Sequence, residues 1–415
     1  MRSSNLDIRL GVEGTMPASE IPRRAEVVIV GGGCMGASIA FHLARRGVGA
    51  ILVERDHIGA GATGHSGAIV RQFYESRVGI RLARKSLAFF RRFQGETGVP
   101  CDFRRTGFLT GSRLRDLPAF DALVGLLRTE GVRLERLRPK EAAGMEPQLD
   151  VSDYEAMVHD PDAGYADPIA TAAGFAQAAC RDGAKAIEGE EVREVIIRRG
   201  RVAGERLRGR DVISSERVVL AAGNWTPWIA RQAGVRLPVH FVRGDVAILR
   251  RPPGSGAPPR IHFDVYGNTY SRPEGEKDVL VGYMDSGPQA ALRGPELLDN
   301  ALPVATGRDL LSRLARRFPI MARAQPRGGW SGLYDVTPDA YPILDAVGPT
   351  GLFVAVGFSG HGFKLCPEVG RLLGEFIASD RKPDELAPLR AHRYREREPV
   401  VPESPFPALR GRTLP

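Results

Sequence analysis

Three glycines are spaced Gly31-x-Gly33-x-x-Gly36, from the end of an apolar run at residues 27–30 into the start of an amphipathic segment at 34–46. The run predicts a buried strand and the segment predicts a helix. In a turn between them Gly31 permits the bend, Gly33 admits a pyrophosphate and Gly36 lets helix and strand pack closely. The first N–H groups of the helix then face the phosphates. The spacing indicates a dinucleotide site, the alternative being a purely structural turn.

The residues after this turn favour one dinucleotide over another. Glu54 ends a second apolar run, residues 51–53, where its carboxylate can accept hydrogen bonds from ribose hydroxyls, and Arg55 follows it. Residues 59–67 are a run of small residues with no counterpart in a plain NAD domain. Small residues let the backbone approach a flat ring, so we expect FAD. The polar members of this run that we expect at the cofactor are Thr63, His65 and Ser66.

A second glycine turn follows the apolar run at residues 351–356 and precedes an amphipathic helix predicted over 363–379. Two-electron reduction leaves negative charge on the pyrimidine edge of a flavin, and a helix N-terminus stabilises such charge. His361 in this turn contacts either the substrate or the turn itself. The other residues of the turn that we expect at the flavin are Gly357, Gly360, Gly362, Phe363 and Lys364.

Together these features resemble the D-amino-acid-oxidase superfamily of flavoproteins. Within it they are similar to sarcosine oxidase and its β-subunit, dimethylglycine dehydrogenase and the proline dehydrogenase β-subunit. The resemblance runs from residue 27 to about 377. It is carried by residues 31–36, 59–71 and 220–225, and by the pair 330–339 and 357–364. It implies FAD as the cofactor, bordered also by Val192, Ala222, Gly223 and Trp225.

The resemblance also implies roles at a substrate, a small amino acid or amine that carries a carboxylate and is oxidised at its C–N bond. Arg71 and Lys364 match positions that hold this carboxylate, and a guanidinium can bind one with two parallel hydrogen bonds. Tyr334 matches a tyrosine of sarcosine oxidases, where glycine and D-amino-acid oxidases have an arginine. With His361 these are our candidate catalytic residues, and the alternative for both cations is a solvated surface position.

Two departures from the family pattern affect the flavin chemistry. Monomeric sarcosine oxidases attach flavin through a thioether to a cysteine, and Gly332 occupies the position of that cysteine. We expect Gly332 beside the flavin, but without a thiol it cannot form the thioether. His65 resembles a histidine that carries flavin in dimethylglycine dehydrogenase, but we expect non-covalent FAD. Leu280 and Met284 occupy the places of a lysine that activates oxygen and an active-site histidine. We therefore expect an electron acceptor other than oxygen.

Composition excludes several other classes of function. The chain has 415 residues and a net charge of +9, but its arginines are scattered and form no basic stripe, so we expect no nucleic-acid partner. No stretch reaches the ~20 apolar residues of a membrane helix. The four cysteines form no C-x-x-C pair, which favours the cytoplasm, and no metal-ligand spacing is present.

The pattern predicts a mixed α/β fold with a Rossmann-like FAD-binding domain and a substrate domain on a mostly antiparallel sheet. The expected FAD-binding domain is discontinuous, comprising residues 23–98, 158–235 and 328–385. The substrate domain takes residues 99–157 and 236–327. A disordered tail at 1–22 and a C-terminal extension at 386–415 complete the chain.

Three other functions remain open. The chain could be a β-like subunit or assembly flavoprotein that works only inside a larger hetero-oligomer. It could instead be a glycine or D-amino-acid oxidase, which Tyr334 disfavours. A plain NAD dehydrogenase is the third.

Overall fold

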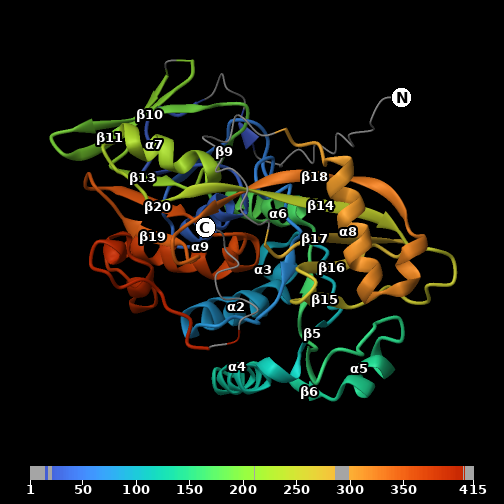
Figure 1. Ribbon diagram of the computed structural model, residues 1–415. Coiled ribbons are helices and arrows are strands. Elements are labelled where there is room, and N and C mark those ends of the chain that lie inside the picture. The colour runs from blue at the N-terminus through green and yellow to red at the C-terminus, as the bar shows by residue number, and fades with distance from the viewer. Residues whose placement is uncertain (1–14, 17–20, 210, 286–298, 405, 407–415) are drawn as a thin grey trace.

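The computed structural model describes residues 15–16, 21–209, 211–285, 299–404 and 406. Two large sheets dominate the fold, one of seven strands and one of eight. Figure 1 shows the strands of the eight-stranded sheet on the right and those of the other on the left. The mixed α/β class predicted from the sequence is confirmed, and no helix within the described ranges has the length and apolar character needed to cross a bilayer.

The seven-stranded sheet is parallel except at one edge, where the last strand is antiparallel. Its central strands are fully buried because helices or further strands cover both faces. In spatial order the strands are β1 (Thr15–Met16), β9 (Lys185–Ile187), β3 (Ala50–Val53), β2 (Val27–Val30), β13 (Arg217–Leu220), β20 (Leu352–Val356) and β19 (Ile343–Ala346).

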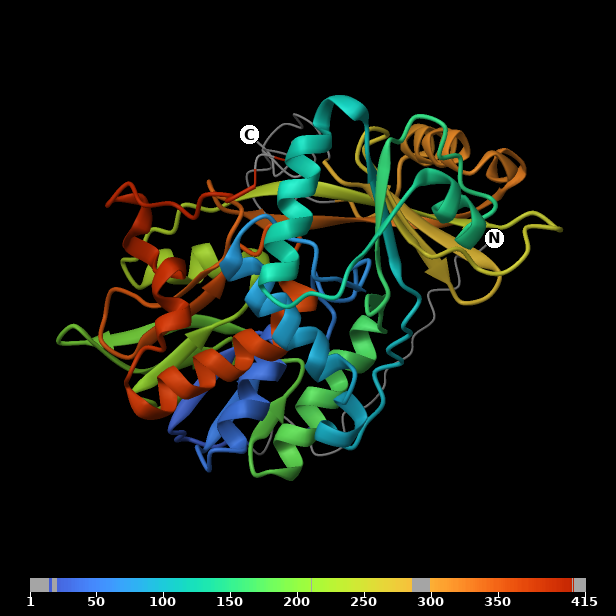
Figure 2. The same cartoon turned by 90° about the horizontal axis from the view of Figure 1, so that it is seen from below.

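Four helices form the main apolar layer beside this sheet. α1 is buried along its whole length because it packs against both α6 and α9, and α2 packs against α9. Figure 2 shows the blue α1, the green α6 and the red α9 gathered in this layer. The helices are α1 (Cys34–Ala44), α2 (Arg77–Phe90), α6 (Pro168–Arg181) and α9 (Gly362–Ser379), with the short α3 (Phe93–Thr97) beside them.

On the other side lies a small antiparallel sheet that packs with α7 (Thr226–Gln232). Its strands are β10 (Val192–Arg198), β11 (Arg201–Leu207) and β12 (Val212–Ile213). A two-stranded sheet of β4 (Ile69–Val70) and β8 (Gly164–Tyr165) leads from the small-residue run toward the second large sheet.

The eight-stranded sheet is antiparallel except between β15 and β5. α8 (Val304–Arg317) covers its outer face, with α4 (Leu117–Thr129) and α5 (Pro139–Met145) toward the far end (Figure 1). In order its strands are β18 (Gln325–Val336), β14 (His240–Arg250), β17 (Asp278–Tyr283), β16 (Thr269–Glu274), β15 (Ile261–Asp264), β5 (Phe108–Ser112), β7 (Ala156–Asp160) and β6 (Glu135–Leu137).

Two details bear on the expected domain limits. β18 pairs with β14 along its whole length, so the expected limit at residue 328 falls inside this strand. Thr15 and Met16 form β1 on the edge strand β9, although they fall within the tail expected to be disordered. The rest of that tail, except residues 21–22, lies outside the described residues.

The C-terminal extension returns to the body of the fold through two 3-10 turns, Asp384–Leu389 and Ala391–Tyr394. Arg393 is fully buried and donates two hydrogen bonds to the carboxylate of Asp339, at 2.8 and 2.9 Å. Residues 399–402 thereby line part of the cavity described below.

Close backbone contacts set the position of α1. A Cβ added at Gly36 would lie 2.0 Å from the carbonyl oxygen of Gly31, and one added at Gly370 of α9 would lie 2.2 Å from the Ser38 hydroxyl. The first contact seats the helix on its own strand, and the second brings α9 against α1.

We therefore expect Gly36→Ala to lower the free energy of unfolding by about 1–3 kcal/mol, because the added carbon must displace backbone. The matched control is Gly125→Ala in α4, where nothing lies within 4 Å of the added carbon. That change should be neutral or stabilising by up to about 1 kcal/mol. Denaturant unfolding measures both, and equal stabilities of the two variants would contradict the packing account.

Candidate active site

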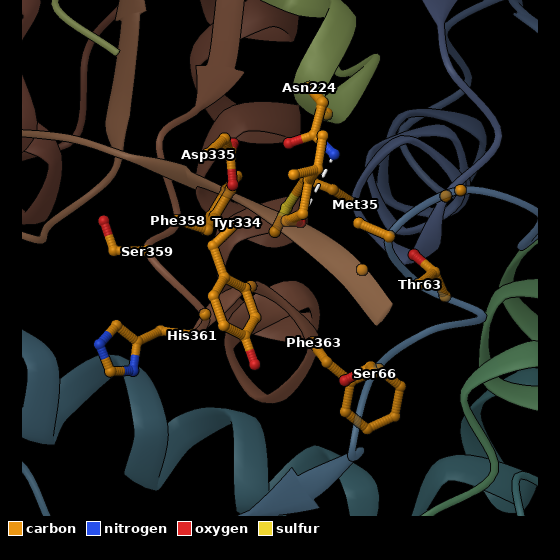
Figure 3. Close-up of a pocket in the computed structure, with 18 of the residues that line it drawn as sticks. Met35, Thr63, Ser66, Asn224, Tyr334, Asp335, Phe358, Ser359, His361 and Phe363 are labelled. Atoms are coloured by element: carbon orange, nitrogen blue, oxygen red, sulfur yellow. Dashed lines mark hydrogen bonds between the residues drawn. The ribbon is translucent and has the colours of Figure 1, made fainter. Parts of the chain in front are cut away.

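One cavity of about 1480 Å³ opens between the two large sheets, and both sheets contribute to its wall. Figure 3 shows side chains from separate parts of the chain around it, among them Met35, Thr63, Tyr334 and Phe363. The volume exceeds the few hundred to ~1,000 Å³ of an ordinary ligand pocket. The cavity therefore has room for a large cofactor together with a small substrate.

The first glycine turn forms one end of this cavity. Gly31 has a φ of +108°, and a Cβ there would lie 2.6 Å from the carbonyl oxygen of Ala221, so only glycine fits. Gly33 lies on the cavity wall, and Thr63 accepts a hydrogen bond of 3.0 Å from the Cys34 N–H at the start of α1. Gly36 packs against Gly31, away from the cavity, as its predicted packing role requires.

Glu54 stands beside this turn. Its carboxylate accepts hydrogen bonds from the N–H groups of Gly32, at 2.6 Å, and Asp56, at 2.8 Å, and burial raises its pKa. These bonds hold the carboxylate at the edge of the cavity with lone pairs to spare. The guanidinium of Arg55 lies 4.3 Å from the ring of Trp225 and forms a cation–π contact beside the same opening.

The second glycine turn is held by Asp335 from β18. Its carboxylate accepts a hydrogen bond of 2.6 Å from the Gly357 N–H, its main-chain carbonyl accepts one of 2.8 Å from Ser359, and burial raises its pKa to about 6. A Cβ at Gly357 would lie 2.2 Å from Thr337. Gly357, which we expected at the flavin, therefore packs behind the turn and is absent from the cavity wall, while Gly360 and Gly362 line it.

Two cations line the cavity near this turn. Arg71 is 4% exposed and Lys364 is 7% exposed. Arg71 donates to the Phe73 carbonyl, and its guanidinium lies 4.8 Å from the rings of both Tyr74 and Phe263. Lys364 donates a long hydrogen bond of 3.4 Å to the Gly360 carbonyl. Among the described residues the Arg71 Nε has no hydrogen-bond partner, although the charges of Glu75 and Asp160 act on this guanidinium.

Burial weakens the charge on both groups, and repulsion by Arg71 weakens it further on Lys364. The pKa of Lys364 is held well below its ordinary value of 10.5 by burial and then by Arg71, and burial also lowers the pKa of Arg71. Burial and the two cations hold the pKa of His361 well below 6.5, so the neutral imidazole is favoured. Its Nδ1 lies 3.3 Å from the Tyr74 hydroxyl. His361 therefore contacts Tyr74, a side chain of the cavity wall, as well as residues of its own turn.

Tyr334 faces the cavity from β18, beside the turn that carries His361 (Figure 3). A Cβ at Gly244 would lie 2.6 Å from its ring, so this glycine makes room for the tyrosine. Tyr270 from β16 lines the same cavity, and burial raises the pKa of both hydroxyls. Both hydroxyls therefore remain protonated donors.

The two positions considered for covalent attachment lie next to each other. A Cβ at Gly332 would lie 3.2 Å from the Cβ of His65. The His65 Nδ1 is 3.0 Å from the Gly61 carbonyl, and Trp330 donates a hydrogen bond of 2.8 Å to the His65 carbonyl. The histidine is therefore held by its own loop and by β18.

The remaining predicted residues also reach this cavity. Ser66, Val192, Ala222, Gly223, Phe363 and Met284 lie on its wall, whereas Leu280 is fully buried within β17. Tyr74, Phe263 and Tyr270 also line the cavity and were not predicted from the sequence. Tyr74 could have been predicted, because it follows Arg71 by only three residues. Phe263 and Tyr270 could not, because only the pairing of strands distant in sequence brings them here.

The residues present fit FAD. Nothing lies within 4 Å of a Cβ added at Gly61 or Gly223, so backbone faces open space at both places. The buried Oδ1 of Asn224, also on the wall, has no hydrogen-bond partner among the described residues. The N-termini of α1 and α9 provide two separate places for negative charge.

Comparison with known proteins identifies the family. Residues 26–376 match the DAO family model, described as FAD dependent oxidoreductase. The chain belongs to this family. Its cofactor is accordingly FAD, and the resemblance to oxidases and dehydrogenases of this superfamily is confirmed.

Individual relatives are distant in sequence. Human mitochondrial sarcosine dehydrogenase is 27% identical over 384 residues, covering 89% of this chain and 41% of that protein. The mouse mitochondrial pyruvate dehydrogenase phosphatase regulatory subunit is 27% identical over 373 residues, covering 86% and 42%. The chain thus spans about two fifths of these curated relatives. The crystal structure of L-proline dehydrogenase from P. horikoshii superposes with a TM-score of 0.84 and 25% identity, covering 92% of this chain and all of that one.

We expect acid precipitation of the purified protein to release its FAD, because Gly332 offers no thiol and His65 is engaged within its loop. Absorbance of the supernatant and mass spectrometry of the peptides measure the released and bound fractions. His65→Ala is the matched control and should release flavin to the same extent. A flavin-bearing peptide that contains His65, lost in the variant, would contradict the prediction.

Proposed function

We propose that this protein oxidises the C–N bond of a small amine or amino acid that carries a carboxylate. The observation that carries the proposal is the pair of buried cations, Arg71 and Lys364, on the wall of the cavity that suits FAD. Removing an ion from water costs several kcal/mol unless a partner compensates. A carboxylate between the two cations supplies that compensation, and it also restores the charge that burial and repulsion by Arg71 weaken on Lys364.

The wall around Arg71 restricts the shape of the ligand. The rings of Tyr74 and Phe263 flank the guanidinium, which fixes its orientation and leaves one apolar side. Tyr270 and Tyr334 close another side with hydroxyl groups that donate hydrogen bonds. A compact ligand with one carboxylate and a short, mostly apolar remainder suits this enclosure, as a methylated glycine or a cyclic amino acid does.

The side chains around the site act by placement rather than as a base. His361 favours its neutral form, but it already meets Tyr74, and the two tyrosines retain their protons. A substrate amine that binds uncharged needs no proton removed before oxidation. FAD supplies the acceptor of the hydride when bound. Holding the reacting C–H bond in one orientation accounts for much of the rate in such a reaction.

The relatives support this substrate class. One is named for sarcosine and a structural neighbour for L-proline, and both of these compounds are secondary amines with a carboxylate. Tyr334 at the position of the arginine in glycine and D-amino-acid oxidases weighs against that alternative.

A second candidate is a subunit that binds FAD but works only in a larger assembly. It is favoured by the likeness to a phosphatase regulatory subunit, a protein named for regulation rather than for oxidation. The two candidates differ in one property. Only an enzyme reduces its own flavin when a substrate amine is added to the purified chain.

We expect Arg71→Ala and Lys364→Met each to weaken binding of propionate while FAD stays bound. Losing one cation from a desolvated anion site costs about 2–5 kcal/mol, about thirtyfold to several thousandfold in Kd. The perturbation of flavin absorbance by propionate measures this. Arg136→Ala on β6, an exposed arginine paired with Asp121, is the control and should bind as the parent does. Unchanged binding in both cavity variants would place the carboxylate elsewhere.

Binding of propionate should also take up a proton. The pKa of Lys364 is lowered in the free protein, and a bound carboxylate raises this pKa again. The affinity for propionate is therefore constant at pH values below the lowered pKa of the free protein. It falls as the pH rises above that pKa, because binding then requires Lys364 to gain a proton. Titration calorimetry in buffers with different ionisation enthalpies measures the uptake. Lys364→Met should abolish it, and uptake that persists in this variant would assign the proton to another group.

A further inference from the structure

A segment close to the C-terminus forms part of the cavity wall. We call residues 399–404 the C-terminal strap, and four of them lie on the wall: Pro399, Val400, Val401 and Pro402. All four side chains are apolar, and the two prolines restrict the backbone of the strap. The strap therefore adds a short apolar wall that belongs to neither of the two large sheets.

Asp339 anchors the first part of the strap. Its carboxylate accepts a hydrogen bond of 2.9 Å from the Val400 N–H. The same carboxylate accepts hydrogen bonds of 2.8 and 2.9 Å from the buried Arg393 and one of 2.7 Å from the Tyr394 hydroxyl. Because Asp339 is held from several sides, the hydrogen bond to it fixes the position of Val400.

Glu403 anchors the other end of the strap. Its N–H donates a hydrogen bond of 2.8 Å to the carbonyl of Glu75. Its carboxylate accepts hydrogen bonds of 3.0 Å from the Arg77 N–H and 2.8 Å from the Arg77 Nε. Beyond the strap, Phe406 is fully buried, and its ring lies 5.1 Å from that of Phe120 in α4. The strap is thus fastened at both ends while its middle borders the cavity.

The strap is fastened beside the residues that we assign to the substrate carboxylate. Tyr74 precedes the anchor Glu75, and its ring lies 4.8 Å from the Arg71 guanidinium. The Tyr74 hydroxyl lies 3.3 Å from the His361 Nδ1. Val400 is half-buried and packs against the apolar cluster that includes Tyr74. The wall formed by the strap therefore borders the part of the cavity in which the remainder of a bound carboxylate would lie.

We propose that the C-terminal strap is a specificity-determining wall of the substrate site, and that Val400 limits the length of the apolar group beside the bound carboxylate. The inference rests on the proposed function, because it takes Arg71 and Lys364 as the carboxylate site. A ligand whose remainder reaches the strap must displace Val400, which the hydrogen bond to Asp339 opposes. A shorter remainder fits without this displacement. The substrate class is thereby narrowed to carboxylate-bearing amines with short apolar groups.

The experiment titrates the FAD-loaded protein with propionate, butyrate, valerate and hexanoate and follows the perturbation of flavin absorbance. We expect the parent to bind hexanoate more weakly than propionate. Val400→Ala should raise the affinity for hexanoate relative to that for propionate by about tenfold or more, since a misfit of one methylene in an apolar pocket is worth about that factor. Val48→Ala is the matched control and should keep the parent ratio, because Val48 packs against the same cluster away from the cavity wall.

A second variant loosens the strap without changing a side chain of its wall. Glu403→Ala removes the acceptor of both hydrogen bonds from Arg77, so it should shift the ratio of hexanoate to propionate affinity in the same direction as Val400→Ala. A purely structural role of Glu403 would lower the stability and leave this ratio unchanged. Glu96→Ala removes an ion pair with Arg45 and is the control for the loss of such a pair elsewhere.

The outcomes separate this inference from the proposed function. If Arg71→Ala weakens propionate binding but Val400→Ala and Glu403→Ala both keep the parent ratio, the strap proposal is wrong and the carboxylate site stands. A parent that binds hexanoate as tightly as propionate would also overturn the strap proposal, because the strap then sets no limit. If none of the carboxylates perturbs the flavin of the parent, the proposed function fails and the role of the strap fails with it.

Discussion

The convergence of two helix N-termini on one cavity is the constraint on which the rest of this structure depends. α1 and α9 each follow a strand of the same parallel sheet, so both begin at the same sheet edge. At Gly36 a side chain would clash with the turn that precedes α1, and at Gly370 of α9 it would clash with Ser38 of α1. The free N–H groups at the two ends then present positive potential to an extended anionic cofactor.

The second large sheet also contributes residues to the cavity wall and to the turn before α9. β18 contributes Asp335, which holds the turn before α9, and Tyr334, which faces the cavity. β16 contributes Tyr270. The cofactor-binding turn is therefore built by both sheets rather than by the Rossmann-like unit alone. Arg71 and Lys364 line the cavity that both sheets border, so a carboxylate bound between them would lie in the same cavity as the proposed flavin site.

Much of this could be predicted from local sequence. Apolar runs bounded by glycine located β2 at Val27–Val30 and β20 at Leu352–Val356, because buried strands of a parallel sheet carry strong local signals. Contacts between distant segments could not be predicted. The expected domain limit at residue 328 falls inside the continuous strand β18, and Gly357 packs against Thr337, two contacts that local sequence does not reveal. Tyr270 and Phe263 depend on strand register across the second sheet, which no single sequence reveals.

We propose that this chain oxidises a carboxylate-bearing amine with its own flavin. The decisive experiment is anaerobic mixing of the purified protein with sarcosine, dimethylglycine, proline, glycine and D-alanine in turn. We expect a secondary or tertiary amine of this set to bleach the flavin, and Arg71→Ala to slow the bleaching at a given concentration. If dithionite reduces the flavin but none of these amines does, the proposed oxidation is wrong and a subunit that works only in a larger assembly is favoured.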